Sequence, residues 1–277
     1  MIDLHVHTRL CGHAVGEIED YVEAAFEGDS PLEVLGISEH LPLPEGFEDP
    51  VGDCTMAASD LIGYIDRLRK LRQKYPSLLI GGELDYIRGY GAYAKSLSRD
   101  PHFDYVIGSV HMLSGWVFDY SPHMFERGLE SHYGGDPDAC ILDYFSMLRM
   151  MLSECDIDIV GHFDLIKKFN VDGKYFSQDE GAYAEEVEKT LALIARMDVL
   201  LEVNTAGLRK PCNEMYPADA IIGRCQELGI GMTLGSDAHS PQEVGCDFER
   251  ALKALRDAGF DRIHYVRGRK RESISLE

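Results

Sequence analysis

Short apolar runs alternate with longer amphipathic segments along most of the 277-residue chain. The runs are rich in Val, Ile and Leu, whereas the longer segments repeat apolar residues at helical spacing. This alternation is typical of β-α units built around a parallel sheet. The pattern predicts strands at 2–6, 34–38, 78–84, 105–111, 157–161, 199–204, 231–235 and 263–266. It predicts helices at 17–26, 57–75, 92–97, 140–153, 179–196, 218–228 and 243–258.

No linker rich in Ser, Gly or Pro divides the sequence, and no internal repeat or low-complexity segment occurs. A domain size of about 150 residues would suggest two domains, but alternating α/β barrels commonly reach about 250 residues as one. We therefore expect a single α/β domain over residues 1–277. The eight predicted strands come close to the number in a closed α/β barrel.

The charge distribution favours a small substrate over a nucleic acid. The net charge is −21, and residues 10–66 contain 14 Asp or Glu and no Lys or Arg. Such a stretch repels a phosphate backbone, whose affinity for proteins depends on basic side chains. For most of these acids, a simpler interpretation is that they keep the protein soluble.

The sequence predicts a cytoplasmic protein that does not bind membranes. No run of roughly 18 apolar residues occurs, and the chain starts without a basic and then apolar signal segment. Its seven cysteines form no C-x-x-C pair, and an odd number cannot all pair within one chain. A reducing compartment fits this cysteine usage.

Seven of the eleven histidines stand at the C-terminal end of a predicted strand or in the loop after it: His5, His7, His13, His40, His111, His162 and His239. In a parallel α/β barrel these strand ends converge on one face, where catalytic groups sit. The side chains of His5 and His7 project to the same side of an extended strand and can bind one ion. For this pair alone, solvated or packed histidines are the simpler interpretation, which weakens as matching residues accumulate.

Two carboxylates, Glu83 and Asp237, occupy similar positions near strand ends. A carboxylate has two oxygens and can bridge two cations, whereas a neutral imidazole gives one nitrogen to one ion. We expect Glu83 to be the bridge. The alternative is that acids at strand ends cap the helices that follow.

Taken in order, six motifs resemble the polymerase and histidinol phosphatase (PHP) family. They are HVHTRLCGH at 5–13, SEH at 38–40, GE at 82–83, GSVH at 108–111, GHFD at 161–164 and GSDAH at 235–239. DLIKKF at 164–169 and NTAGLR at 204–209 are similar to its histidinol-phosphatase branch. The resemblance implies a distorted (β/α)7 TIM-like barrel with three divalent metal ions, so that the strand predicted at 263–266 falls outside the barrel.

The resemblance also implies the ligands. One ion takes His5, His7, Glu83 and Asp237, a second takes Glu83, His111 and His162, and a third takes His13, His40 and His239. Sites of this mixed nitrogen and oxygen type accept zinc, iron, manganese or cobalt. Two carboxylates give about −2 of charge against about +6 from three divalent cations, so the cavity should attract a phosphate dianion.

The implied activity is hydrolysis of L-histidinol phosphate to L-histidinol and phosphate in histidine biosynthesis, by attack of a metal-bridging hydroxide. The expected catalytic residues are Glu83, Asp237 and His239. For the phosphate we expect Arg209 first, because a guanidinium offers paired planar donors, and then Lys168 and Arg9. Surface solvation is the alternative interpretation for Lys168.

Three further acids, Glu39, Asp85 and Asp164, are expected either to meet a substrate amine or to orient the ligand imidazoles. Two other functions stay open at this point. One is a PHP-type phosphoesterase that acts on nucleotides or short oligonucleotides. The other is a non-catalytic metal-binding protein, although complete retention of the ligand positions speaks against it.

Overall fold

The apolar runs form short parallel strands in the computed structural model, which describes residues 1–28, 30–52 and 54–276. These strands are β1 (Ile2–Asp3), β2 (Val34–Ile37), β3 (Leu78–Ile80), β4 (Glu83–Asp85), β5 (Ile107–Ser109), β8 (Ile159–Val160), β9 (Leu200–Asn204) and β10 (Met232–Gly235). One sheet has the order β1-β2-β3 and another the order β10-β9-β8-β5-β4. All neighbours in both sheets run parallel, which confirms the predicted α/β class. Every residue of these strands is buried, as expected for parallel strands covered on both faces.

Backbone contacts beyond the named strands bring the two sheets together. Leu4 N donates to Leu234 O over 3.1 Å, and Val6 forms a parallel bridge with Ala238. The residues after β1 therefore lie beside the end of β10. On the other side, the residues after β2 lie beside β4, because His40 forms a parallel bridge with Glu83.

The strand predicted at 78–84 is interrupted at Gly81 and Gly82, where it changes partner from β2 to β5. Both glycines are tightly packed, since a Cβ on Gly81 would overlap the Tyr105 ring and one on Gly82 would lie 2.7 Å from Leu41 Cδ2. Tyr105 is fully buried and its hydroxyl donates to Leu4 O over 2.5 Å. This packing fixes the chain just before the first histidine.

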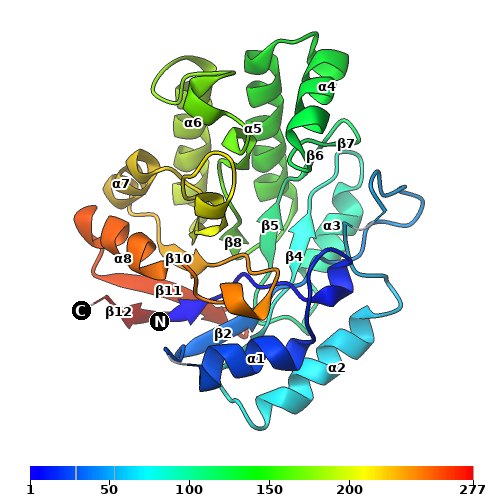
Figure 1. The fold of residues 1–277 in the computed structure, drawn as a ribbon, viewed down its shortest axis with the longest axis vertical. Helices are drawn as coiled ribbons and strands as arrows, with labels where there is room; N and C mark the ends of the chain where they lie inside the picture. Colours follow the sequence, from blue (N-terminus) through cyan, green and yellow to red (C-terminus); the bar gives the residue numbers. More distant parts are fainter. Residues whose placement is uncertain (29, 53, 277) are drawn as a thin grey trace.

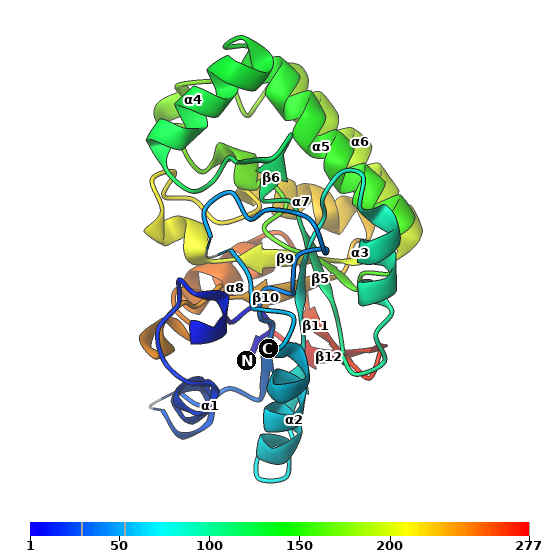
Figure 2. The ribbon, with the colours of Figure 1, turned by 90° about the vertical axis from the view of Figure 1, so that its right-hand side faces the viewer.

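The helices cover the outside of the sheets (Figure 1). They are α1 (Ile18–Glu27), α2 (Leu61–Arg72), α3 (Gly91–Ser98), α4 (Pro122–Tyr133), α5 (Pro137–Glu154), α6 (Gly181–Met197), α7 (Asp219–Leu228) and α8 (Phe248–Asp257). Figure 2 shows α4, α5 and α6 at one end of the molecule and α1 and α2 at the other. Within the described ranges, we find no helix with both the length and the apolar character needed to span a bilayer.

Seven of these helices match predicted ones, with differences at their ends. Helix α8 begins five residues later than predicted, because a capping box between Ser240 and Glu243 closes a separate 3-10 helix (Pro241–Glu243). Asp247 then takes a positive φ of 62° and redirects the chain into α8. Helix α4 was not predicted; Ser121 caps it by accepting a hydrogen bond from Met124 N.

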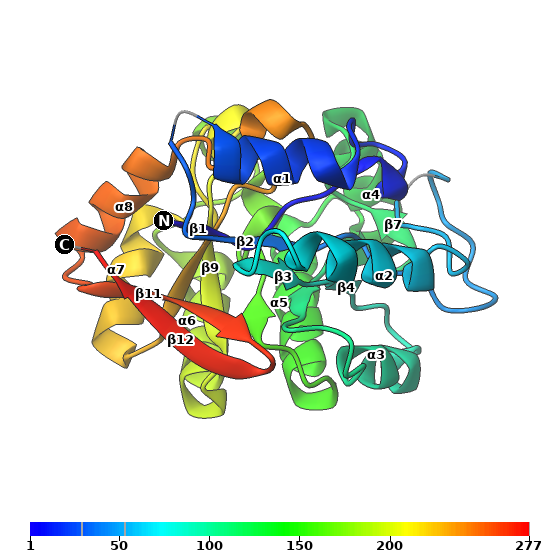
Figure 3. The same ribbon diagram turned by 90° about the horizontal axis from the view of Figure 1, so that it is seen from below.

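Two antiparallel hairpins complete the fold. One consists of β6 (Met112–Leu113) and β7 (Trp116–Val117), directly after His111. The other consists of β11 (Arg262–Arg267) and β12 (Lys270–Ser275). The strand predicted at 263–266 therefore pairs outside both parallel sheets. Figure 3 shows this hairpin crossing beneath the sheets, with the two termini near each other.

Candidate metal centre

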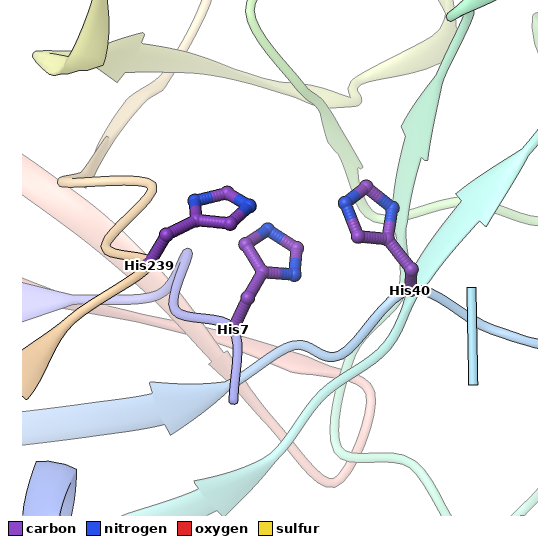
Figure 4. Close-up of side chains that lie close together, drawn as sticks. All are labelled: His7, His40 and His239. Atoms are coloured by element: carbon purple, nitrogen blue, oxygen red, sulfur yellow. The ribbon is translucent and has the colours of Figure 1, made fainter. Parts of the chain in front are cut away.

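The nine residues expected to bind metal follow the C-terminal ends of strands in both sheets, apart from Glu83, which begins β4, and His13, which follows the 3-10 helix Arg9–Cys11. Their imidazole rings are packed together. The ring centroid of His7 lies 4.9 Å from the ring centroid of His5, 4.2 Å from that of His40 and 4.7 Å from that of His239. Figure 4 shows three of these rings meeting from three separate segments of the chain.

The remaining histidines extend the same cluster in two directions. His13 stacks on His239 with ring centroids 4.9 Å apart. The ring centroids of His111 and His162 are 4.7 Å apart, and that of His162 is 5.6 Å from His5. The structure thus brings all seven histidines together, although 234 positions separate the first from the last.

Glu83 lies at the centre of the cluster and is fully buried. Its Oε1 lies 2.9 Å from His162 Nε2 and 3.3 Å from His5 Nε2. Its Oε2 lies 2.9 Å from His40 Nδ1 and 3.5 Å from His7 Nε2. Each oxygen therefore lies near two imidazoles that the resemblance assigns to different ions, and a carboxylate with two such oxygens can contact more than one cation.

Four buried atoms at the centre of the cluster make no hydrogen bond within the described structure: His5 Nε2, His7 Nε2, His40 Nδ1 and Glu83 Oε2. Leaving such groups without partners is costly, and a shared cation would satisfy them. The ligand atoms of His5, His7 and Glu83 all lie within 4.8 Å of one another, as do those of His7, His40 and His239. The donor set therefore fits divalent metal ions.

The electrostatics of the cluster favour ionised carboxylates. Although burial alone would raise it, His40, His5 and His111 hold the pKa of Glu83 well below its ordinary range. Burial and the neighbouring His7 hold the pKa of His239 well below its ordinary value, so this ring is neutral and offers a lone pair. Nearby acids outweigh burial and raise the pKa of His7 to about 9.

Two acids hold ligand rings by hydrogen bonds from outside the cluster, and a third acid lies close to another ring. Glu202 Oε1 lies 2.7 Å from His5 Nδ1, and Asp85 is hydrogen bonded to His111 Nδ1. Glu39 Oε1 lies 3.5 Å from the Nδ1 of His7. In each case the second ring nitrogen is left for the cluster, the usual arrangement around metal-binding histidines.

The three acids expected to meet a substrate amine or to orient imidazoles have different partners in the structure. Glu39 and Asp85 contact ring nitrogens, whereas Asp164 binds Lys167 Nζ over 2.9 Å and accepts from the hydroxyl of Tyr183. Sequence reasoning missed Glu202, although a signal was present, since it is the one charged residue of the apolar strand β9.

A cavity of about 340 Å3 opens beside the cluster. Of the three basic residues expected to bind phosphate, Lys168 lines this cavity. Arg209 is not among the lining residues; its Nη2 donates to Ser236 O over 2.8 Å and its Nη1 to Asp247 Oδ2 over 3.2 Å. Arg9 is exposed and paired with Glu17. Phosphate binding by these three residues stays a prediction.

Comparison with known proteins identifies the family. The PHP domain model matches residues 3–206. A Deinococcus radiodurans protein named "Probable histidinol-phosphatase" is 35% identical over 262 residues, which cover 94% of each chain. The histidinol-phosphatase of Bacillus subtilis is 29% identical, over 91% of this chain and 98% of its own.

A solved structure agrees in fold. Histidinol phosphate phosphatase from Lactococcus lactis subsp. lactis, complexed with zinc, L-histidinol and phosphate, superposes with a TM-score of 0.74 at 20% identity. The superposition covers 98% of both chains. The resemblance read from the motifs is thus confirmed, and the chain belongs to the PHP domain family, in its histidinol-phosphatase branch.

Proposed function

We propose that the protein hydrolyses L-histidinol phosphate to L-histidinol and phosphate in histidine biosynthesis. The observation that carries this proposal is the cluster of seven histidines and two carboxylates at the wall of an open cavity. A small phosphate ester fits a site that combines buried metal ligands with the basic side chain of Lys168. Relatives that match nearly the whole chain carry the name histidinol-phosphatase.

We propose three divalent ions, of zinc, iron or manganese, held as the family pattern implies. His5, His7, Glu83 and Asp237 would hold the first, Glu83, His111 and His162 the second, and His13, His40 and His239 the third. Bound cations would supply a water of lowered pKa and positive charge opposite the phosphoryl oxygens.

The chain's own residues have defined roles in this proposal. Glu83 would be shared by the first two ions, and Asp237, whose Oδ1 lies 3.3 Å from His7 Nε2, would complete the first site. His239 contributes a neutral ring nitrogen on the cavity side. Lys168 is placed to neutralise a phosphoryl oxygen. Catalysis would then consist mainly of positioning and electrostatic stabilisation, as phosphoryl transfer requires.

We further propose that the strands form one distorted seven-stranded barrel within a single domain. The bridges Val6–Ala238 and His40–Glu83 support this closure, if β3 and β4 are counted as one bent strand. All seven cysteines are free thiols, which supports a reducing compartment such as the cytoplasm.

The test is a phosphatase assay on purified protein before and after chelation, with zinc, iron and manganese restored one at a time. We expect turnover of histidinol phosphate that disappears with chelation and returns with metal. A panel of nucleotides and short oligonucleotides serves as the comparison. A large preference for nucleotides would favour the alternative PHP activity, and metal binding without turnover of any ester would favour a binding protein.

A further inference from the structure

An ion pair at the cavity wall plays no part in the metal centre described above. Asp119 follows the β6–β7 hairpin, and Lys168 follows the 3-10 helix Leu165–Lys167. Lys168 Nζ lies 2.9 Å from Asp119 Oδ2, and both side chains are 16% exposed. Both residues line the cavity. The pair is therefore open to a ligand and still largely shielded from water.

Both members of the pair are anchored to the cluster by short backbone connections. Phe118 N donates to His111 O over 3.3 Å, which holds Asp119 against the hairpin that begins after His111. Leu165 N donates to His162 O, and Lys168 N donates to Leu165 O, both over 2.9 Å. The Nε2 atoms of His111 and His162 are themselves 3.1 Å apart. The ion pair thus stands beside the second proposed metal site.

Asp119 is also the acid that the metal centre leaves available. Four carboxylates line the described part of the cavity wall, at Glu83, Asp85, Asp119 and Asp237. Glu83 and Asp237 are assigned to metal ions, and Asp85 is hydrogen bonded to His111. The ion pair with Lys168 uses Oδ2 of Asp119, and a carboxylate can accept from further donors through its other oxygen.

We propose that Asp119 is a specificity-determining residue that binds the ammonium group of a phosphorylated amino alcohol. This inference rests on the proposed function, because histidinol phosphate carries its ammonium on the carbon next to the one that bears the ester. A phosphate held between the metal ions and Lys168 leaves the ammonium within the same small cavity as Asp119. The ion pair then presents one charge to each end of the substrate.

The experiment compares two substrates on the metal-loaded enzyme: histidinol phosphate and imidazolylpropyl phosphate, which is the same ester without the amine. The readout is the kcat/KM for histidinol phosphate divided by the kcat/KM for imidazolylpropyl phosphate. Asp119→Asn keeps the size of the side chain and removes its charge. We expect the ratio to fall about 10- to 100-fold, the range for losing a hydrogen bond between charged groups. Asp119→Glu, which keeps the carboxylate, should retain more of the preference than the Asn variant.

Asp143→Asn is the matched control, because Asp143 is 19% exposed and paired with Arg88 but does not line the cavity. Its ratio should equal that of the wild type. An Asp119→Asn enzyme that loses activity on both esters to the same extent would overturn the inference and leave the proposed function standing. The same conclusion follows if the wild type does not discriminate between the two esters. If the wild type hydrolyses neither ester, the proposed function is wrong and the inference with it.

Discussion

Replacing Glu202 with Gln should weaken metal binding, because this carboxylate holds two parts of the candidate centre. Its Oε1 lies 2.7 Å from His5 Nδ1, and its Oε2 accepts from His162 N over 2.8 Å and from Asn204 Nδ2 over 3.1 Å. A glutamine has one oxygen and one amide NH2, so it cannot accept at both ends. One end of this buried arrangement must therefore change.

Either orientation of the glutamine has a defined cost. If its oxygen faces His162 N, its NH2 faces His5 Nδ1 and favours the tautomer with the proton on Nε2. That nitrogen faces Glu83 and Asp237, at 3.3 Å and 3.9 Å from their oxygens, so the lone pair needed for a cation is lost. In the opposite orientation, the NH2 meets the N–H of His162, and buried donors are left without an acceptor.

The two costs can be given magnitudes. Changing the hydrogen-bond partner of a ligand histidine typically lowers metal affinity by about 10- to 100-fold. This corresponds to about 1.4 to 2.7 kcal/mol. A buried donor without an acceptor costs about 1 to 3 kcal/mol of folding free energy. We therefore expect Glu202→Gln to raise the Kd for zinc by about 10- to 100-fold or to lower the unfolding free energy of the metal-free protein by about 1 to 3 kcal/mol.

Chelator competition on metal-stripped protein measures the first quantity, and urea unfolding measures the second. Glu188→Gln is the control, because Glu188 forms an exposed pair with Arg224 on the outside of the fold. It should change neither value measurably. A Glu202→Gln protein with the zinc Kd and the unfolding curve of the wild type would refute the view that Glu202 holds His5.

Three further substitutions test burial and charge. Lys167→Met should lower the unfolding free energy by about 3 to 5 kcal/mol, because Asp164 stays buried without its cationic partner; an unchanged urea midpoint would contradict this. Gly235→Ala should lower the melting temperature and the zinc affinity together, since the new Cβ would overlap Glu202 Oε1. Wild-type values of both would contradict this, because they would show that the backbone moves enough to accommodate the methyl group. Although burial opposes the shift, Lys189 and Arg149 hold the pKa of Glu186 below its ordinary value of 4.5. The folded state should therefore lose stability as the pH falls below that value. Glu186→Gln should make the free energy of unfolding, measured with urea, depend less on pH in this acidic range.

The strand pattern and the placement of the nine expected metal ligands follow from simple rules, and both could be predicted. Parallel strands buried on both faces read as apolar runs, and their C-terminal ends meet at one face. Helix α4 was not predicted, although its apolar residues Phe125 and Leu129, four positions apart, both face the core. Its start signal, Ser121 followed by Pro122, was nevertheless present.

The partners of the buried acids could not be read from the sequence, because the sheet order decides them. Glu202 and His5 are 197 positions apart and meet because β10 pairs with β9 on one side and adjoins the residues after β1 on the other. What the sequence does contain is the acid itself, in the middle of an apolar strand with a neighbour on each side. A charge in that position has no route to solvent, so it requires a buried donor or cation within the fold. An isolated Glu in a central strand therefore predicts a buried partner, and only the order of the strands determines that the partner is the imidazole of His5.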